Sequence, residues 1–324
     1  MGVVFVKSAI VPKGKFVSEN EPITTAYDHG TLYGDGVFEG IRIYNGGVFR
    51  LNDHIDRLCR SAAGIKIKMP FSNEDVEKYI LETCRRNEKK DGYIRVVVTR
   101  GDGDLGLDPE KCKTPTFFII ADGITLYPQE FYDHGMPVIV AKTRRPSTEV
   151  LDPNIKMTQY INNVLCKIEA NNAGVMDAIM LTPHDHVTEC TGANIFFVKN
   201  GELYTPAPNI VLQGITRKTV MEIVDSLEIP VNQGYYSIDK FYDADEVFVT
   251  GTGAKICPVR TINDIEREKY FDFEKPGPVT RKIMEKFDTI TKDPEYLTPI
   301  ADAKESWEEP NKKTPISRID LLGI

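Results

Sequence analysis

The segment Gly40-Ile41-Arg42-Ile43-Tyr44-Asn45-Gly46-Gly47-Val48-Phe49 (GIRIYNGGVF) holds two short apolar runs on either side of an Asn-Gly pair. Asn and Gly tolerate the positive φ angles that a tight hairpin turn requires. Alternating apolar residues on each side are typical of half-buried strands. The segment therefore predicts a β-hairpin in the first third of the chain.

Helices and further strands follow the hairpin. Residues 52–63 and 72–86 carry apolar side chains at helical spacing, and Ser72 or Asn73 is a candidate N-cap of the second helix. The β-branched and aromatic residues of 93–99 and 116–121 predict strands. We therefore predict the α+β fold class, with residues 1–121 forming a small N-terminal domain.

A change of pattern marks the end of this domain. Residues 122–135 lose their periodicity and contain two glycines and a proline, which is typical of an interdomain linker. Periodic segments resume at 136–296, where we expect a large second domain that includes a helix after Lys156 and a second hairpin at Asn200-Gly201. Because residues 297–324 are polar and contain several prolines, we expect an irregular C-terminal extension there.

Composition and charge narrow the classes of function. The chain has 324 residues and a formal net charge of -8, with both signs mixed along it, so we expect no nucleic-acid partner. No apolar run approaches the ~20 residues of a membrane span, and no signal peptide is visible, so we expect a cytoplasmic protein without a membrane partner. The six cysteines form no C-x-x-C pair, which argues against a zinc site or a disulfide framework.

Two segments have the pattern of anion sites. In QGITR (213–217) a glycine precedes an amphipathic helix, whose first turn offers unpaired amides and the positive end of the helix dipole. In TGTGA (250–254) a strand ends in a glycine-rich turn whose amides can form a concave nest. Each pattern alone is also compatible with an ordinary linker.

Other motifs argue against several enzyme classes. GDGDLG (101–106) imitates a dinucleotide-binding loop, but Asp102 and Asp104 would repel a pyrophosphate, and no P-loop is present. His184 and His186 lack a third nearby ligand, so we expect a solvated turn and no metal. A G-x-S-x-G nucleophile elbow is also absent.

The segment YGDGVFEGIR (33–42) resembles the substrate-loop signature of branched-chain amino acid aminotransferases, which are fold-type IV pyridoxal-phosphate enzymes. Six further signatures of that family follow in order: HIDRL (54–58), YIR (93–95), IKMTQYINN (155–163), TECTGAN (188–194), LQGITR (212–217) and TGT (250–252). The resemblance covers about residues 1–290. It implies a cofactor between two domains and a homodimer or assembly of dimers, in which residues 103–107 reach the neighbouring site.

The resemblance also implies which residues hold pyridoxal 5'-phosphate. Lys156 carries the cofactor as a Schiff base and moves the proton between Cα and C4′, a task suited to lysine because its amine loses a proton when desolvated. Glu189 faces the pyridine nitrogen and keeps it protonated. The remaining ligands are those of the phosphate and the ring oxygen: Arg57, Ile215, Thr216 and Thr252 for the phosphate, and Tyr160 for the ring oxygen.

Substrate residues are implied in the same way. Tyr93 and the amides of Thr252 and Gly253 meet the α-carboxylate. Arg42 and Arg95 at the pocket edge pair with the γ-carboxylate of glutamate, although structural ion pairs are the alternative for both. The side-chain pocket is lined by three aromatic residues: Tyr33, Phe38 and Tyr127.

One turn departs from the family pattern. Relatives commonly have Ala-Ala-Glu after Gly-Thr, whereas this chain has Gly253-Ala254-Lys255. The amide nest is retained, but the local charge is changed. Fine substrate preference is therefore left open by this segment.

We expect transamination between branched-chain L-amino acids (Leu, Ile, Val) and 2-oxoglutarate, giving branched 2-oxo acids and L-glutamate. The partners are then small amino acids and 2-oxo acids. Within the same fold, the alternative is a D-amino acid transaminase or an aminodeoxychorismate lyase. From another class, the alternative is a protein that binds pyridoxal phosphate without turnover.

Overall fold

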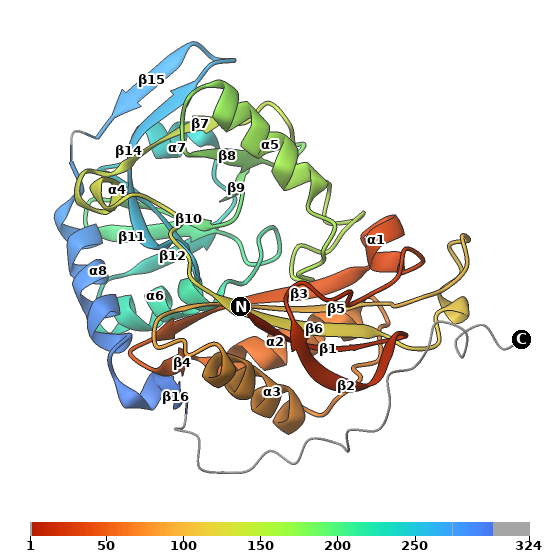
Figure 1. The fold of residues 1–324 in the computed structure, drawn as a ribbon. Helices are drawn as coiled ribbons and strands as arrows, with labels where there is room; N and C mark the ends of the chain where they lie inside the picture. The colour runs from red at the N-terminus through yellow and green to blue at the C-terminus, as the bar shows by residue number, and fades with distance from the viewer. Residues whose placement is uncertain (1, 274, 301–324) are drawn as a thin grey trace, which may run out of the picture.

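The computed structural model describes residues 2–273 and 275–300. Figure 1 shows two sheets, each covered by helices, with the N-terminal strands in one and the later strands in the other. No helix of the described residues is long and apolar enough to cross a membrane. The elements up to the second sheet are β1 (Val3–Ser8), β2 (Val11–Ser18), α1 (His29–Tyr33), β3 (Gly36–Tyr44), β4 (Gly47–Phe49), α2 (Leu51–Gly64), α3 (Asn73–Arg86), β5 (Gly92–Thr99), η1 (Pro109–Lys111), β6 (Thr116–Asp122) and α4 (Gln129–His134).

The elements from Met136 onward build most of the second sheet and its helices. They are β7 (Met136–Val140), α5 (Ile161–Asn172), β8 (Asp177–Leu181), β9 (Val187–Cys190), β10 (Asn194–Lys199), β11 (Glu202–Pro206), α6 (Ile215–Ser226), β12 (Val231–Gly234), α7 (Ile238–Tyr242), β13 (Glu246–Gly251), β14 (Lys255–Asp264), β15 (Lys269–Asp272), α8 (Pro278–Ile290), η2 (Pro294–Tyr296) and β16 (Leu297–Pro299).

The first sheet has seven strands in the order β16-β4-β3-β5-β6-β1-β2. Its predicted hairpin is confirmed: Tyr44 pairs with Gly47 across a turn in which Asn45 and Gly46 have φ angles of 50° and 79°. The predicted helices are also confirmed as α2 and α3, and Ser72 caps α3 by accepting a hydrogen bond from the Asp75 amide. Both helices pack on one face of the sheet around a shared apolar core (Figure 1).

The second sheet closes on itself. Its strands follow the order β12-β11-β10-β13-β14-β7-β8-β9, and β9 pairs with β10 as well as with β8, so that six strands form a ring. Apolar side chains from β7, β8, β10, β13 and β14 fill one core inside this arrangement. The predicted second hairpin is confirmed, because Asn200 and Gly201 again have positive φ angles between paired Lys199 and Glu202.

Residues 122–135 were expected to be irregular, and this is only partly so. The helix α4 occupies residues 129–134, and it begins directly after Pro128. Phe131 and Tyr132 of this helix pack against the core of the second sheet. The short segment has too few residues to show helical periodicity, and tertiary packing stabilises it instead.

The expectation of an irregular chain after residue 296 is wrong for its first residues. Leu297 to Pro299 form β16, which pairs antiparallel with β4 of the first sheet (Figure 1). Leu297 also packs in an apolar cluster that joins both sheets, together with Phe49, Phe196 and Phe287. A three-residue strand carries almost no sequence signal, so only its partner β4 defines it. Residues 301–324 of the expected extension lie outside the described residues.

The helix that follows Lys156 has its apolar face directed away from the protein. Ile161, Val164, Leu165 and Ile168 recur at helical spacing, yet they are between 45% and 62% exposed. The side of α5 that packs on the second sheet presents Cys166 and Ala170. Contiguous exposed apolar side chains of this kind are typical of an interaction surface.

Candidate active site

One cavity between the two sheets brings together all seven residues predicted to hold the cofactor. They come from α2, from the segment before α5, from β9, from the start of α6 and from the turn after β13. The seven are Arg57, Lys156, Tyr160, Glu189, Ile215, Thr216 and Thr252. Residues that are far apart in the chain therefore line one space.

Lys156 is held in this cavity by its own backbone. Its carbonyl oxygen accepts a hydrogen bond from the Phe38 amide at 3.0 Å, and its amide donates to Ser61 Oγ at 3.1 Å. The ammonium lies 4.5 Å from the centre of the Phe38 ring and 3.3 Å from Tyr160 Oη. No carboxylate lies within 4 Å of this amine among the described residues. Aromatic groups of Phe38 and Tyr160 are therefore the neighbours of the lysine amine.

Glu189 lines the same cavity and is almost fully buried. Its Oε2 accepts hydrogen bonds from the Leu212 amide at 3.1 Å and from Asn194 Nδ2 at 3.3 Å. Its Oε1 accepts from Arg145 at 2.6 Å. Sequence reasoning did not identify Arg145, because nothing in its neighbourhood marks it as a partner of a strand 44 residues away.

The start of α6 supplies a candidate anion site in the same cavity. Gly214 is its N-cap and has no side chain, and the amides of Ile215 and Thr216 have no backbone partner among the described residues. A Cβ at position 214 would collide with Asn194 Oδ1, so glycine is required for this close approach. Thr250 Oγ1, which lines the same cavity, is buried without a hydrogen-bond partner. These unsatisfied donors suit a phosphate group.

Arg57 is fixed beside α6 by a buried network that the sequence did not reveal. Its Nε and Nη2 donate to the two oxygens of Glu39 at 2.6 and 2.8 Å, and its Nη1 donates to the Gln213 carbonyl oxygen. His54 Nδ1 donates to the same carboxylate at 2.8 Å. Burial alone would raise the pKa of Glu39, but Arg57 and His54 hold it well below its usual range. Burial lowers the pKa of His54 despite the adjacent carboxylate. Glu39 and His54 lie inside the signatures 33–42 and 54–58. Their place in those signatures was the only feature of the sequence that could have identified them as partners of Arg57.

On the substrate side, Phe38, Gly40, Tyr93 and Arg95 share one face of the first sheet. Gly40 pairs with Arg95 across β3 and β5, and the guanidinium of Arg95 lies 4.5 Å from the Phe38 ring centre and 5.5 Å from that of Tyr93. The Phe38 ring meets Tyr160 edge-on at 5.1 Å. Neither Arg95 nor Arg42 makes an ion pair within 4 Å among the described residues, so the alternative of structural ion pairs finds no support there.

Gly40 allows the Tyr93 hydroxyl to lie directly over the strand. A Cβ at position 40 would collide with Tyr93 Oη. We therefore expect Gly40→Ala to displace Tyr93 and to raise KM for the amino acid at least about tenfold, the effect of losing one hydrogen bond to a charged group. Cofactor affinity should change little. Steady-state kinetics with a cofactor titration checks this, and Gly123→Ala is the control, because a Cβ at position 123 meets no atom within 4 Å and φ there is not positive. An unchanged KM would contradict the role of Tyr93.

Arg42, Tyr127 and Gly253 line a second cavity, beyond the turn that connects β13 and β14. Tyr127 is buried, and its hydroxyl donates to Asp177 at 3.2 Å. The side chain therefore attaches the 123–128 segment to the second sheet. Burial raises the pKa of Tyr127 well above its ordinary value. Tyr127 therefore lines a different cavity from the one that holds Lys156 and Glu189.

Tyr33 is separate from the other predicted substrate residues. It ends α1 and lines none of the cavities described above, and its hydroxyl donates to the carbonyl oxygen of Leu105 in the 101–107 loop. His29 of the same helix donates to the Asp104 carbonyl oxygen at 2.9 Å. Tyr33 and the 101–107 loop thus form one unit, whose residues Leu105 and Leu107 are exposed.

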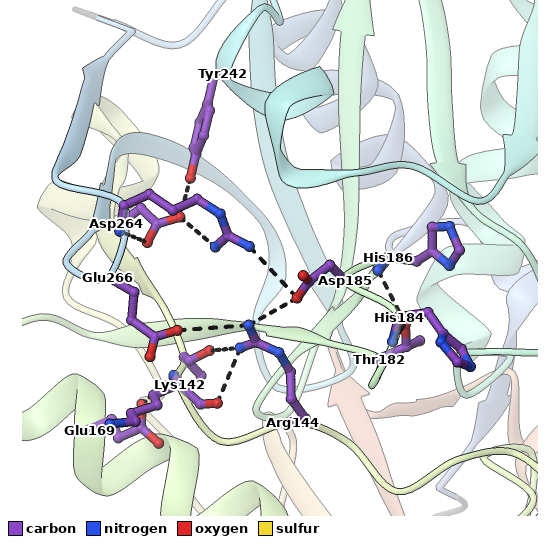
Figure 2. Close-up of polar contacts among 12 residues, drawn as sticks. Lys142, Arg144, Glu169, Thr182, His184, Asp185, His186, Tyr242, Asp264 and Glu266 are labelled. Atoms are coloured by element: carbon purple, nitrogen blue, oxygen red, sulfur yellow. Dashed lines mark hydrogen bonds and ion pairs between the residues drawn. The ribbon is translucent and has the colours of Figure 1, made fainter.

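His184 and His186 lie in a turn whose amides both donate to Thr182 Oγ1 (Figure 2). Asp185 between them accepts from Arg144 at 2.9 Å (Figure 2). Arg267 lies 3.6 Å from Asp185 and 3.0 Å from Asp264. This network ties the turn to the end of β14. In the part of the chain that the structure describes, no group of three or more potential ligands could hold a metal ion.

Comparison with known proteins assigns this arrangement to a family. The model of the family Amino-transferase class IV matches residues 36–262, and the chain belongs to that family. The chain is 45% identical over 278 residues to a protein of Methanocaldococcus jannaschii that carries the provisional name branched-chain-amino-acid aminotransferase, covering 86% of this chain and 94% of the relative. It is 30% identical over 285 residues to a D-alanine aminotransferase of Listeria monocytogenes, covering 86% and 94%.

Solved structures have the same fold. The branched-chain aminotransferase of Thermoproteus uzoniensis, crystallised with norvaline, superposes with a TM-score of 0.82 at 34% identity, and the match covers 93% of this chain and 99% of that chain. The branched-chain amino acid aminotransferase of Thermobaculum terrenum in its PLP (holo) form superposes with a TM-score of 0.80 at 26% identity, covering 93% and 98%. The predicted α+β class and the fold-type IV resemblance are therefore confirmed, and the family match confirms that the chain is an aminotransferase.

Proposed function

We propose that this protein is a pyridoxal 5'-phosphate-dependent transaminase that exchanges amino groups between branched-chain L-amino acids and 2-oxoglutarate. The observation that carries the proposal is the common cavity of Lys156, Glu189, Arg57 and the start of α6. An amine, a carboxylate and an anion site in one cavity match the aldehyde, the ring nitrogen and the phosphate of this cofactor. When bound, pyridoxal phosphate supplies an aldehyde that reacts with amines and a ring that accepts electrons from Cα.

The chain's own residues divide the remaining tasks. Arg57, the Ile215 and Thr216 amides and Thr252 would hold the phosphate, and the unpartnered Thr250 hydroxyl lies beside them. Glu189 would hold a proton on the ring nitrogen, with its charge oriented by the Arg145, Leu212 and Asn194 donors. Tyr160, next to the lysine amine, would contact the ring oxygen.

Lys156 would move the proton at the substrate Cα. Phe38 and Tyr160 lie beside its amine, and no carboxylate pairs with it among the described residues. The neutral amine is the form that accepts a proton. Tyr93 and the Thr252 and Gly253 amides would orient the substrate by its α-carboxylate.

The same pocket would accept both substrate types. The ring of Phe38 offers an apolar wall to a leucine or valine side chain, and Arg95 stacks on that ring without a carboxylate partner among the described residues. A guanidinium in this position can pair with the γ-carboxylate of glutamate and remain stacked when an apolar substrate is bound.

A second copy of the chain would complete each site. Leu105 and Leu107 beside Tyr33 are 70% and 77% exposed, and α5 carries an exposed apolar face. Burying these surfaces against a partner copy would be favourable. In a homodimer, Tyr33 and the 101–107 loop would reach the partner's pocket, which gives this exposed unit a task in substrate binding.

Because one relative is a D-alanine aminotransferase, a comparison of L- and D-amino acids as substrates decides between the proposed activity and its alternative. We expect the purified enzyme to convert L-leucine, L-isoleucine and L-valine with 2-oxoglutarate, each with a kcat/KM at least about a hundredfold above that of D-alanine, as expected where one enantiomer loses a charged contact. Coupled assays for glutamate and for each 2-oxo acid measure this directly. Faster turnover of D-alanine than of every branched L-substrate would assign the alternative activity.

A further inference from the structure

Apart from the Gly253 amide, the residues that line the cavity beyond the 251–255 turn have no task in the proposed function. Its volume is about 380 Å³, and it lies where Arg42, the 124–133 segment, Gly253, Lys255 and α8 meet. Small-molecule sites have this size and commonly occur at such junctions between domains. Gly253 separates it from the cofactor cavity, in which the preceding residue, Thr252, takes part.

Two cations face this cavity from different elements. Arg42 extends from β3, and its guanidinium carbon lies 5.2 Å from the centre of the Tyr44 ring. Lys255 is the first residue of β14, and its ammonium lies 5.6 Å from the same ring centre. Both positive charges therefore gather at one aromatic ring. Like charges brought together in this way are destabilising unless an anion is placed near them.

The cavity does not satisfy these cations internally. Among the described residues, neither Arg42 nor Lys255 has a carboxylate within 4 Å, and Arg42 Nε is buried without a hydrogen-bond partner. A buried donor without a partner costs about 1–3 kcal/mol. Arg42 and Lys255 therefore lack an anionic acceptor among the described residues.

Two acidic residues also line the cavity, and they do not fill this gap. Asp133 on α4 and Asp288 on α8 are both exposed, so they lie at the solvent side and are screened. The other polar residues that line the cavity are Thr125, Tyr127, Gln129 and Tyr132. A carboxylate has two planar acceptor oxygens, which suit the fork of a guanidinium and a nearby ammonium.

We propose that this cavity is a carboxylate-binding subsite in which Arg42 and Lys255 hold the anion. It favours dicarboxylic over monocarboxylic acids. The carboxylate has two sources: the second acid group of a dicarboxylic substrate that extends past Gly253, or a separate dicarboxylic acid acting as an effector. The first source rests on the proposed function, and the second needs only the cavity.

The test is calorimetric titration of the holoenzyme with glutarate and with pentanoate, which has the same five-carbon chain and one carboxylate fewer. The variants are Lys255→Met, Lys255→Arg and, as a control of equal charge change on α8 outside the cavity, Lys286→Met. We expect Lys255→Met to raise the glutarate Kd about tenfold, as removal of one charged hydrogen bond does. The pentanoate Kd should change less than about twofold, Lys255→Arg should restore glutarate binding, and Lys286→Met should match the wild type.

Inhibition kinetics against L-leucine distinguishes the two sources. Competitive inhibition by glutarate assigns the carboxylate to the substrate, and noncompetitive inhibition assigns it to an effector; either supports the subsite. Equal glutarate affinity in Lys255→Met and Lys286→Met overturns it, as does an equal loss of pentanoate binding. If Lys255→Met does not fold, Lys255→Gln makes the same test. Failure of the proposed function is separate, because it would appear as absent L-leucine turnover in the wild type.

Discussion

The Lys156→Ala protein is expected to fold, to bind pyridoxal phosphate weakly and to lose transaminase activity by more than about a thousandfold, the scale seen when a nucleophile or base is removed. Two properties of the amine are lost together: its covalent bond to the aldehyde and its ability to move the Cα proton. The fold should survive because the backbone hydrogen bonds to Phe38 and Ser61 do not involve the side chain.

The measurement is reduction of the purified enzyme with borohydride, followed by peptide mass spectrometry. The wild type should carry the reduced cofactor on the peptide that contains residue 156. Lys142→Ala, which removes an exposed lysine outside the cavity, is the matched control and should retain both the adduct and the activity. A reduced adduct found on another lysine would overturn the assignment of Lys156.

For Glu189→Gln we expect a loss in kcat of about 10²–10³-fold, comparable to removal of one preorganised electrostatic contact at a reacting group. Glutamine keeps the shape and can still accept from the Leu212 amide, so the change removes chiefly the negative charge. Without that charge the ring nitrogen is no longer held protonated, and the ring accepts electrons from Cα less readily.

Stopped-flow absorbance of the half-reaction with L-leucine measures this step apart from cofactor binding. The charge change also leaves Arg145 without its carboxylate, so Glu189→Gln should be compared with Glu189→Gln combined with Arg145→Met. If the double variant recovers wild-type kcat, the loss came from the unpaired arginine and Glu189 has no electrostatic role in catalysis. Glu285→Gln, at an exposed position on α8, is the surface control and should leave kcat unchanged.

Local rules in the chain were sufficient for the two hairpin turns and for the helices α2, α3, α5 and α6. The Asn45-Gly46 hairpin depends on two φ angles, and α3 depends on its cap and apolar spacing, all of which are encoded within a few residues. The seven predicted cofactor residues were found because each sits in a short signature, and the cavity that contains them all agrees with that expectation. Their chemical roles await the experiments above.

Long-range contacts decided the rest. The apolar stripe of α5 predicted a helix but not that the stripe would be exposed, since which face is covered depends on the neighbouring sheet and on partners outside the chain. β16 exists only because β4 offers a free edge. Arg145 pairs with Glu189, and Glu39 with Arg57, through side chains that are distant in sequence. The gathering of Arg42 and Lys255 at one ring has the same origin. Short-range φ preferences and periodicity are properties of the chain itself, whereas burial, charge pairing and cavities are properties of surfaces that meet only after folding.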